Sequence, residues 1–313
     1  MDEGDADARQ RQLRQGTLVD DAASDLDALN DLANLERAAN SDGAANLERA
    51  ANLDGAANSD GAANLDGSAR PPGAGVLRIS ELFSSIQGEG ASAGEPCVFL
   101  RLALCNLRCS WCDTKYTWDW RQYRYAEQVR EHSVAEIAER LLIALRNQAV
   151  ETGVAGRPRL VLTGGEPLIQ GARLVELLSL LPADVVVEVE TNGTLQAPSQ
   201  LLDRVDQWNV SPKLSHSGDP LKRRIVAAAL TALLQTDRAW LKLVVDDEAD
   251  VAEAEQLIAQ LSWPRERVLL MPQAQTRVEL ARRLPVVQRL AAAAGLGYCT
   301  RLHVERWDDQ RGV

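Results

Sequence analysis

The stretch "RLVLTGGEP" (residues 159–167) is a short apolar run that ends in a polar motif rich in glycine. A continuous apolar run of this length is typical of a strand covered on both faces, as in a parallel sheet. Ligands bind at the carboxyl ends of parallel strands, so we expect the loops that follow the strands to meet at one mouth. Four other polar motifs also follow predicted strands: "CNLRCSWCDT" (105–114), "ETNGT" (190–194), "SPK" (211–213) and "PQAQT" (272–276).

From residue 74 onward, predicted strands alternate with predicted helices. In the helices apolar residues recur at three- and four-residue steps, as in "VAEIAERLLIAL". The alternation predicts the α/β class, with a parallel sheet that right-handed crossovers curve into a partial, open TIM-like barrel of about six strands. We expect strands at 97–104, 159–164, 185–191, 207–211, 240–246 and 268–272, and helices at 133–150, 170–181, 197–206, 219–235, 248–261 and 276–294.

The N-terminal segment, residues 1–73, has a different composition. Up to Arg70 it holds fifteen Asp and Glu residues against six Lys and Arg, and a six-residue repeat runs from Leu32 to Gly67. Hexapeptide periods also occur in parallel β-helices, but this repeat offers little apolar surface to bury. We therefore expect a mostly disordered, acidic, low-complexity tail that ends in the linker "ARPPGAG" (69–75), followed by one folded domain over 74–313.

Charge and composition exclude several classes of function. The tail carries most of the net charge of −11, and the remainder has no basic stripe, so we expect no direct nucleic-acid substrate. No apolar window approaches the length of a membrane span, and no targeting peptide is visible, so we expect no membrane association. Five cysteines, three of them crowded together, do not suit a secreted disulfide framework and predict a cytoplasmic protein.

The crowded cysteines are Cys105, Cys109 and Cys112, spaced Cys-x3-Cys-x2-Cys. A structural zinc site takes four ligands, and the fourth would have to come from outside the run. Three thiolates also suit an iron–sulfur cluster that keeps one iron open for a small molecule. The spacing favours the cluster but leaves zinc open. The other candidate ligands are Cys97, interpreted as an inert buried thiol, Cys299, His132, His216 and His303.

A Cys-x3-Cys-x-aromatic-Cys run followed by a strand that ends in "GGEP" resembles the radical S-adenosylmethionine (SAM) enzymes. Alone, "TGGEP" is more typical of a strand-to-helix turn. The resemblance implies a [4Fe-4S] cluster held by the three cysteines, with S-adenosylmethionine chelating the open iron and yielding a 5′-deoxyadenosyl radical. It places Trp111 near the adenine. It assigns the methionine amino group to Gly164, Gly165 and Glu166.

Five further motifs extend the resemblance to one subfamily, the 7-carboxy-7-deazaguanine synthases. They are "FSSIQGEGASAGEPCVFLRL" (83–102), "CNLRCSWCDT", "ETNGT", "VSPK" (210–213) and the terminal "RLHVERWDDQRGV" (301–313), and the resemblance spans about residues 77–313. It implies a radical SAM catalytic domain over 74–313, which contracts the ring of 6-carboxy-5,6,7,8-tetrahydropterin with loss of ammonia and the help of Mg2+. It also implies a homodimer, and an electron donor such as flavodoxin or ferredoxin.

The subfamily resemblance assigns further roles by matching position. The substrate's carboxylate is assigned to Arg101, and Mg2+ to Thr114. The remaining substrate contacts are assigned to Ile86, Gln87, Gly88, Glu89, Thr163, His303 (on a strand-like stretch) and the terminal residue Val313. The remaining S-adenosylmethionine contacts are assigned to Glu190, Asn192, Ser211, Pro212, Lys213 and Gln273.

The chain departs from the family pattern in two places. Leu104 stands where glycine usually precedes the first cysteine, and the ending "ERWDDQRGV" is more acidic than usual. A rival reading is another radical SAM enzyme, such as a glycyl-radical activase. Such activases often carry auxiliary clusters, for which only Cys97 and Cys299 remain. A structural zinc or cluster module is a second rival, but it gives "GGEP", "ETNGT" and "SPK" no role.

Overall fold

The computed structural model describes residues 75–152 and 156–313. The prediction of a disordered tail over residues 1–73 lies outside the described residues. In the described part, no helix combines the length and the apolar character that crossing a membrane requires.

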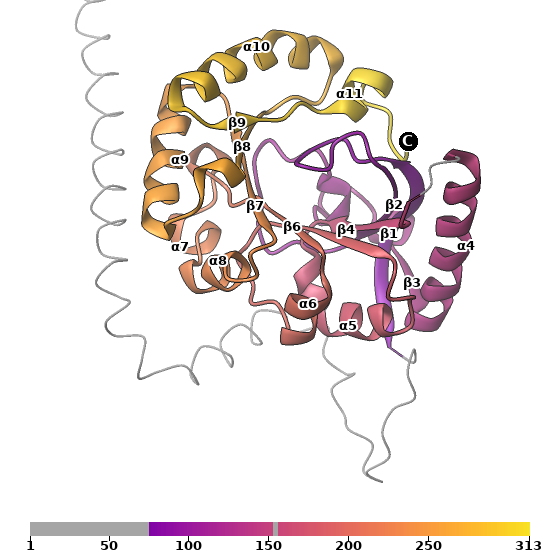
Figure 1. The fold of residues 1–313 in the computed structure, drawn as a ribbon. Coiled ribbons are helices and arrows are strands. Elements are labelled where there is room, and N and C mark those ends of the chain that lie inside the picture. Colours follow the sequence, from indigo (N-terminus) through magenta and orange to yellow (C-terminus); the bar gives the residue numbers. More distant parts are fainter. Residues whose placement is uncertain (1–74, 153–155) are drawn as a thin grey trace, which may run out of the picture. The chain divides into compact units, whose positions relative to one another are not determined.

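The strands of the described residues form one nine-stranded sheet (Figure 1). Six parallel strands lie side by side in the order β2-β4-β5-β6-β7-β8, and they coincide with the six predicted strands. The α/β class and the open, mostly parallel sheet are thus confirmed. The strands are β1 (Val76–Ile86), β2 (Pro96–Leu102), β3 (Arg130–Ser133), β4 (Arg159–Gly164), β5 (Val186–Thr191), β6 (Gln207–Val210), β7 (Ala239–Val245), β8 (Val268–Pro272) and β9 (Gly297–Tyr298).

Helices cover the outer face of the curved sheet in chain order (Figure 1). α4 packs on β1 and β2, α8 on β6, α9 on β7 and α10 on β8. Five of the six predicted helices are present as single elements, namely α4, α5, α6, α9 and α10. The helices are α3 (Tyr125–Gln128), α4 (Val134–Thr152), α5 (Gly171–Ser179), α6 (Ser199–Arg204), α7 (Leu221–Arg224), α8 (Ala227–Leu234), α9 (Glu248–Leu261), α10 (Arg277–Ala294) and α11 (Leu302–Trp307).

Two local predictions are wrong. The single helix predicted over 219–235 is broken into α7 and α8, because Ile225 and Val226 between them adopt extended backbone angles. Both residues are β-branched, and such side chains favour extended conformations over helix. The strand-like stretch predicted around His303 is α11, in which the backbone N–H of Glu305 donates to the carbonyl of Arg301 at 3.0 Å.

The long strand β1 was not among the predicted strands, and it determines where the motif "QGEG" (87–90) lies. β1 runs antiparallel to β2 and ends beside its first residue, with Ile86 opposite Pro96. The loop between them, which contains "QGEG" (87–90), therefore reaches the sheet from the amino ends of the parallel strands. There Ser92 donates to Glu188 at 2.6 Å and accepts from Gln207 at 3.1 Å, near the starts of β5 and β6. This loop closes the floor below the mouth.

The two faces of the parallel strands differ in polarity. The outward side chains of β5, Val187 and Val189, belong to the main apolar core between sheet and helices. Between them, Glu188 and Glu190 project to the inner face, as expected for the two-residue period of a strand. On β7, Lys242 alternates in the same way with core residues Leu241 and Leu243. The inner face is therefore equipped to hold a polar ligand.

Candidate active site

The loops that follow β2, β4, β5, β6 and β8 meet at one cavity of about 400 Å³, as the sequence predicts. This volume lies in the range of small-molecule sites. All predicted site residues lie in the described part of the chain, and all but three line the cavity. Those that line it are Gln87, Gly88, Glu89, Arg101, Cys105, Cys109, Trp111, Cys112, Thr114, Thr163, Gly164, Gly165, Glu190, Asn192, Ser211, Lys213, Gln273, His303 and Val313.

Three predicted residues lie outside the lining: Ile86, Glu166 and Pro212. Glu166 is fully buried, and its carboxylate accepts hydrogen bonds from the backbone N–H of Leu168 (3.0 Å), the backbone N–H of Asn192 (2.7 Å) and the hydroxyl of Thr191 (2.9 Å). Burial raises the pKa of Glu166, and these three donors partly oppose the rise. The side chain thus ties the "GGEP" loop to the "ETNGT" loop and faces away from the cavity.

The two glycines of "GGEP" allow close approach to the cysteine loop. Gly164 has a φ of 143°, and a Cβ atom there would lie 2.1 Å from the carbonyl oxygen of Leu102. A Cβ atom on Gly165 would lie 2.2 Å from the carbonyl oxygen of Leu104 and 2.8 Å from the Cβ of Cys105. No larger residue fits at either place without moving backbone.

Leu104, at the usual glycine position, adopts a φ of 79°. This left-handed conformation is costly for a residue with a side chain. Its backbone is held on both sides, because its N–H donates to Thr117 at 2.7 Å and its carbonyl accepts from Glu166 N–H at 2.8 Å. The position therefore requires a glycine-like backbone even though this chain carries leucine.

The three thiols of the cysteine loop are free and line the same cavity. Burial raises the pKa of the Cys105 thiol and raises that of Cys109 to about 11. Among residues 75–152 and 156–313, no three His, Cys, Asp or Glu side chains form a group that could hold one metal ion. Three thiol donors around one cavity fit an iron–sulfur cluster, which cysteine thiolates hold.

Trp111 forms one wall beside these thiols. Its ring stacks on His216 at a centroid distance of 5.4 Å, and the ammonium of Lys213 lies 5.7 Å from the ring centroid. Lys213 also donates to the hydroxyl of Ser211 at 2.9 Å. We call this region, with Cys105, Cys109, Cys112, Trp111 and the two glycines, the thiol side of the cavity.

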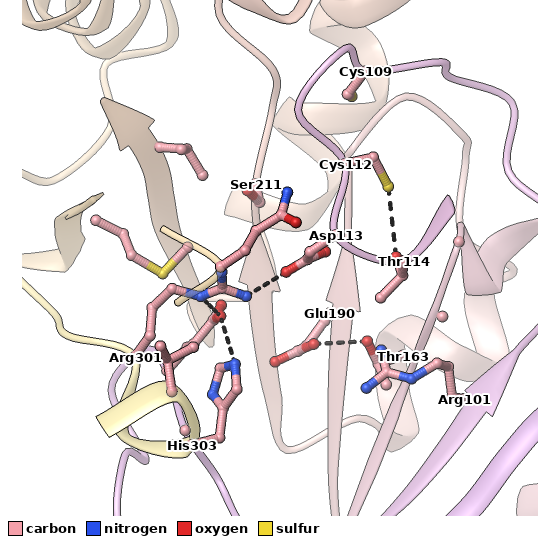
Figure 2. A pocket seen from close by; sticks show the side chains of 18 of the residues that line it. Arg101, Cys109, Cys112, Asp113, Thr114, Thr163, Glu190, Ser211, Arg301 and His303 are labelled. Atoms are coloured by element: carbon pink, nitrogen blue, oxygen red, sulfur yellow. Dashed lines mark hydrogen bonds and ion pairs between the residues drawn. The ribbon is translucent and has the colours of Figure 1, made fainter. Parts of the chain in front are cut away.

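Glu190 lies at the base of the cavity between the thiols and the opposite wall (Figure 2). Its carboxylate accepts from the hydroxyl of Thr163 at 2.7 Å and from the amide of Gln87 at 3.2 Å. The same Gln87 amide donates to Glu188 at 2.6 Å, and its carbonyl accepts from the backbone N–H of Glu89. Gln87 therefore orients the acids of the floor.

The opposite wall carries a network of ion pairs around Glu89. Its carboxylate pairs with the ammonium of Lys242 at 2.5 Å and with the guanidinium of Arg301 at 2.8 Å. Arg301 also donates to Asp113 (Figure 2). It donates to the carbonyl of Ala274 as well, so it joins three loops. Burial alone would raise the pKa of Glu89, but the two cations hold it well below its usual range.

Two of these residues escaped the sequence prediction. Lys242 interrupts the apolar run "WLKLVVD" and is 5% exposed, so a lone charge in a buried strand was the available signal. Arg301 had no such signal, because its surroundings come from three distant segments. Beside this network, burial lowers the pKa of His303, whose ring packs over Gly88. We call the region of Glu89, Arg101, Lys242, Arg301 and the C-terminus the charged side.

A second cluster on the charged side is built on Glu81. Its carboxylate accepts from Arg101 Nε at 2.7 Å, from the Tyr116 hydroxyl at 3.0 Å and from Arg311 Nε at 2.5 Å. Glu81 thereby fixes Arg101 and, through Arg311, the last residues of the chain, which also line the cavity. The Nη groups of Arg101 have no hydrogen-bond partner among the described residues, and they remain available to a ligand.

Comparisons with known proteins point to one family. The chain is 38% identical to the 7-carboxy-7-deazaguanine synthase of Pyrobaculum aerophilum over 238 residues, which cover 75% of this chain and 97% of that protein. It is 37% identical to the synthase of Halobacterium salinarum, in a match that covers 74% of this chain and 91% of that protein. It is 31% identical to the synthase of Rhodopirellula baltica, in a match that covers 76% of this chain and 89% of that protein. The chain belongs to the 7-carboxy-7-deazaguanine synthase family.

Members of the 7-carboxy-7-deazaguanine synthase family are radical S-adenosylmethionine lyases, so the resemblance drawn from the motifs is confirmed and the chain is an enzyme of this class. No protein-family model matches the chain. The crystal structure of QueE from Escherichia coli has the same fold, with a TM-score of 0.50 over 72% of this chain and 93% of that one, at 23% identity. Family membership favours a synthase over a glycyl-radical activase.

Proposed function

We propose that the cavity binds 6-carboxy-5,6,7,8-tetrahydropterin and contracts its ring to 7-carboxy-7-deazaguanine with loss of ammonia, for queuosine or another 7-deazapurine. The observation that carries the proposal is the lining of one cavity by the three thiols, the "GGEP" glycines and an arginine with free Nη groups. The thiols suit a cluster, the glycines suit S-adenosylmethionine and the arginine suits a carboxylate-bearing substrate. The thiol side then binds the cofactors, and the charged side binds the substrate.

On the thiol side, Cys105, Cys109 and Cys112 hold the [4Fe-4S] cluster. The cluster with S-adenosylmethionine supplies the radical that starts the reaction. The backbones of Gly164 and Gly165 bind the methionine amino group. The remaining contacts to S-adenosylmethionine come from Trp111 against the adenine and from Glu190, Asn192, Ser211, Pro212, Lys213 and Gln273.

Glu166 acts differently from its first assignment. Both of its carboxylate oxygens already accept hydrogen bonds within the protein. Its contribution to S-adenosylmethionine binding is therefore indirect, because it fixes the backbone of the Asn192 loop against the glycines.

On the charged side, the guanidinium of Arg101 grips the substrate's carboxylate with its two Nη groups, a geometry that arginine suits. Glu89 is held ionised by its cations and accepts from the amino and amide N–H groups of the pterin. Thr163, His303 and Val313 complete this wall. Ile86, Gln87 and Gly88 belong to the floor segment that positions Glu89.

A Mg2+ ion is assigned to Thr114, whose hydroxyl lies 3.6 Å from the sulfur of Cys112. Mg2+ prefers oxygen ligands in octahedral geometry, and one hydroxyl supplies a single position. The other positions fall to substrate oxygens and water. Thr114 would thus hold the ion only together with the bound substrate.

We further propose a homodimer in the cytoplasm that takes electrons from a flavodoxin or ferredoxin and binds neither nucleic acid nor membrane. The folded part of the chain has no basic stripe, which supports the exclusion of nucleic acid.

The test is an anaerobic assay. The protein is reconstituted with iron and sulfide, then supplied with a reductant, S-adenosylmethionine, Mg2+ and 6-carboxy-5,6,7,8-tetrahydropterin. We expect equal amounts of ammonia and 7-carboxy-7-deazaguanine, measured by mass spectrometry. Cleavage of S-adenosylmethionine without any deazapurine would refute the assigned substrate, and binding of zinc in place of iron would refute the cluster.

A further inference from the structure

The three thiols of the cysteine loop are not equivalent in their surroundings. The indole N–H of Trp118 donates to the sulfur of Cys112 at 3.4 Å. In the described part of the chain, neither Cys105 nor Cys109 receives a hydrogen bond from a side chain. A tryptophan side chain is a donor only and is neutral at every accessible pH, so the direction of this bond is fixed.

Trp118 is held in this position by its own loop. Its backbone N–H donates to Lys115 at 3.0 Å. The preceding residue, Thr117, is fully buried, donates from its hydroxyl to Thr114 at 2.8 Å and accepts from Leu104 N–H at 2.7 Å. These bonds hold the backbone of Trp118 beside the cysteine loop, and none of them involves a bound group. Trp118 also lines the cavity.

We infer that Trp118 is a positioning residue that makes the iron–sulfur cluster easier to reduce, through its hydrogen bond to Cys112. The inference rests on the proposed function, since it takes the three cysteines to be cluster ligands. A thiolate accepts a hydrogen bond more strongly than a thiol does. Hydrogen bonds to the sulfur atoms are among the features that set the reduction potential of an iron–sulfur cluster.

The direction of the effect follows from charge. The cluster gains one electron from a reduced flavodoxin or ferredoxin, which is oxidised by one electron, and no proton moves. The added negative charge is shared with the ligand sulfurs, and the N–H dipole of Trp118 points at one of them. The reduced state is thus stabilised more than the oxidised state, so the potential rises.

Trp120 provides a matched control two residues away. It packs edge-on against Tyr125 at a centroid distance of 5.0 Å, is 37% exposed and does not line the cavity. Replacing it changes the loop's aromatic content without touching a thiol. Trp111 is unsuitable as a control because it forms the wall assigned to adenine.

The test is a redox titration of the cluster-loaded protein, followed by the EPR signal of the reduced cluster. At the wild-type midpoint potential, we expect Trp118→Phe to lower the ratio of reduced to oxidised cluster about fivefold, as for the loss of one ordinary hydrogen bond. For one electron this ratio corresponds to about 40 mV. Trp120→Phe should leave the midpoint unchanged.

An unchanged or raised potential in Trp118→Phe, with its full complement of iron and sulfide, would overturn the inference and leave the proposed function standing. Failure of the wild type to bind any cluster would overturn both. If Trp118→Phe does not load iron, Trp118→3-benzothienylalanine keeps the ring shape and replaces only the N–H by sulfur. The same fall in potential is expected there, and its absence would overturn the inference.

Discussion

Glu166 and Glu89 are both largely buried carboxylates beside the same cavity, but their surroundings differ in kind. Glu166, behind the thiol side, accepts only neutral donors: two backbone N–H groups and a hydroxyl. Glu89, on the charged side, is paired with Lys242 and Arg301. Burial therefore raises the pKa of Glu166, whereas two cations override burial and depress the pKa of Glu89.

The contrast shows how the two sides are built. The thiol side depends on backbone shape, because glycines, tight loops and neutral hydrogen bonds bring three thiols around one space. The charged side depends on ion pairs that join strands far apart in the sequence, as Lys242 of β7 joins Glu89 of the floor loop. Substitutions should consequently damage cofactor loading on one side and stability or substrate affinity on the other.

The largest effect is expected for Cys109→Ala on the thiol side. The protein should fold, because alanine suits a site that is 7% exposed, but it should lose the cluster and with it product formation down to the detection limit. Iron and sulfide analysis, together with the ammonia assay, measures this. The control is Cys97→Ala, a buried thiol outside the cavity, which should load the cluster normally. Full loading of Cys109→Ala would contradict the assigned ligands.

On the charged side, Lys242→Met should destabilise the fold by about 1–3 kcal/mol, because Glu89 loses one of its two cations and keeps only Arg301. Urea unfolding of the cluster-free protein measures the loss. The double variant Lys242→Met with Glu89→Gln should recover part of it, since the carboxylate that lost one of its two cations is gone. If the two single losses simply add, the pair is not coupled as the structure indicates.

The two glutamates should respond to pH with opposite signs. The folded-state pKa of Glu89 is depressed, so its stabilising contribution is complete above the unfolded value of about 4.3 and is lost as pH falls through the folded pKa. The pKa of Glu166 is raised, so its contribution is greatest below the unfolded value and falls as pH rises.

Urea unfolding from pH ~7 to ~3 compares each glutamine variant with the wild type. The advantage of the wild type over Glu89→Gln should shrink on acidification. Relative to Glu166→Gln, the wild type should gain on acidification. Parallel curves for the two variants would contradict the contrast between the two sides.

The smallest effect is expected at Leu104. Leu104→Gly should stabilise the protein by about 0.5–1 kcal/mol, because relief of the left-handed backbone outweighs the greater freedom of glycine in the unfolded chain. Leu104→Ala removes the same side-chain contacts without that relief and should destabilise it. The midpoints of urea unfolding measure both changes in stability. Equal stabilities of the two variants would show that the backbone at Leu104 is not strained.

The sequence predicts the thiol side well, because its residues lie in short motifs that follow strands. The spacing of the three cysteines and the two glycines of "GGEP" are enough to predict that these residues lie together at the cavity. The side chain of Glu166 turns away from the cavity, and this escapes prediction because two of its partners lie at the end of the neighbouring strand β5 and on the loop after it. The position of "IQGEG" at the amino ends of the parallel strands also escapes prediction, because it depends on β1, a strand of mixed composition that runs antiparallel to β2.

The charged side is harder to read from sequence. Arg101 and Glu89 come from the family resemblance, whereas Lys242 and Arg301 appear only once β7, the floor loop and α11 are placed together. The break between α7 and α8 has a local cause instead: two β-branched residues interrupt an otherwise helical pattern. Ion pairs between distant segments leave no periodic signal in the sequence.

The division of one cavity into a thiol side for S-adenosylmethionine and a charged side for the pterin is tested most directly by anaerobic binding titrations. S-adenosylmethionine and 6-carboxy-5,6,7,8-tetrahydropterin are each titrated into reconstituted wild type, Cys109→Ala and Arg101→Lys. We expect Cys109→Ala to lose S-adenosylmethionine and retain the pterin. Arg101→Lys keeps its charge but loses the planar fork, so it should weaken the pterin about 30-fold and leave S-adenosylmethionine unchanged. If Arg101→Lys binds the pterin as tightly as the wild type, or Cys109→Ala retains S-adenosylmethionine, the division is wrong.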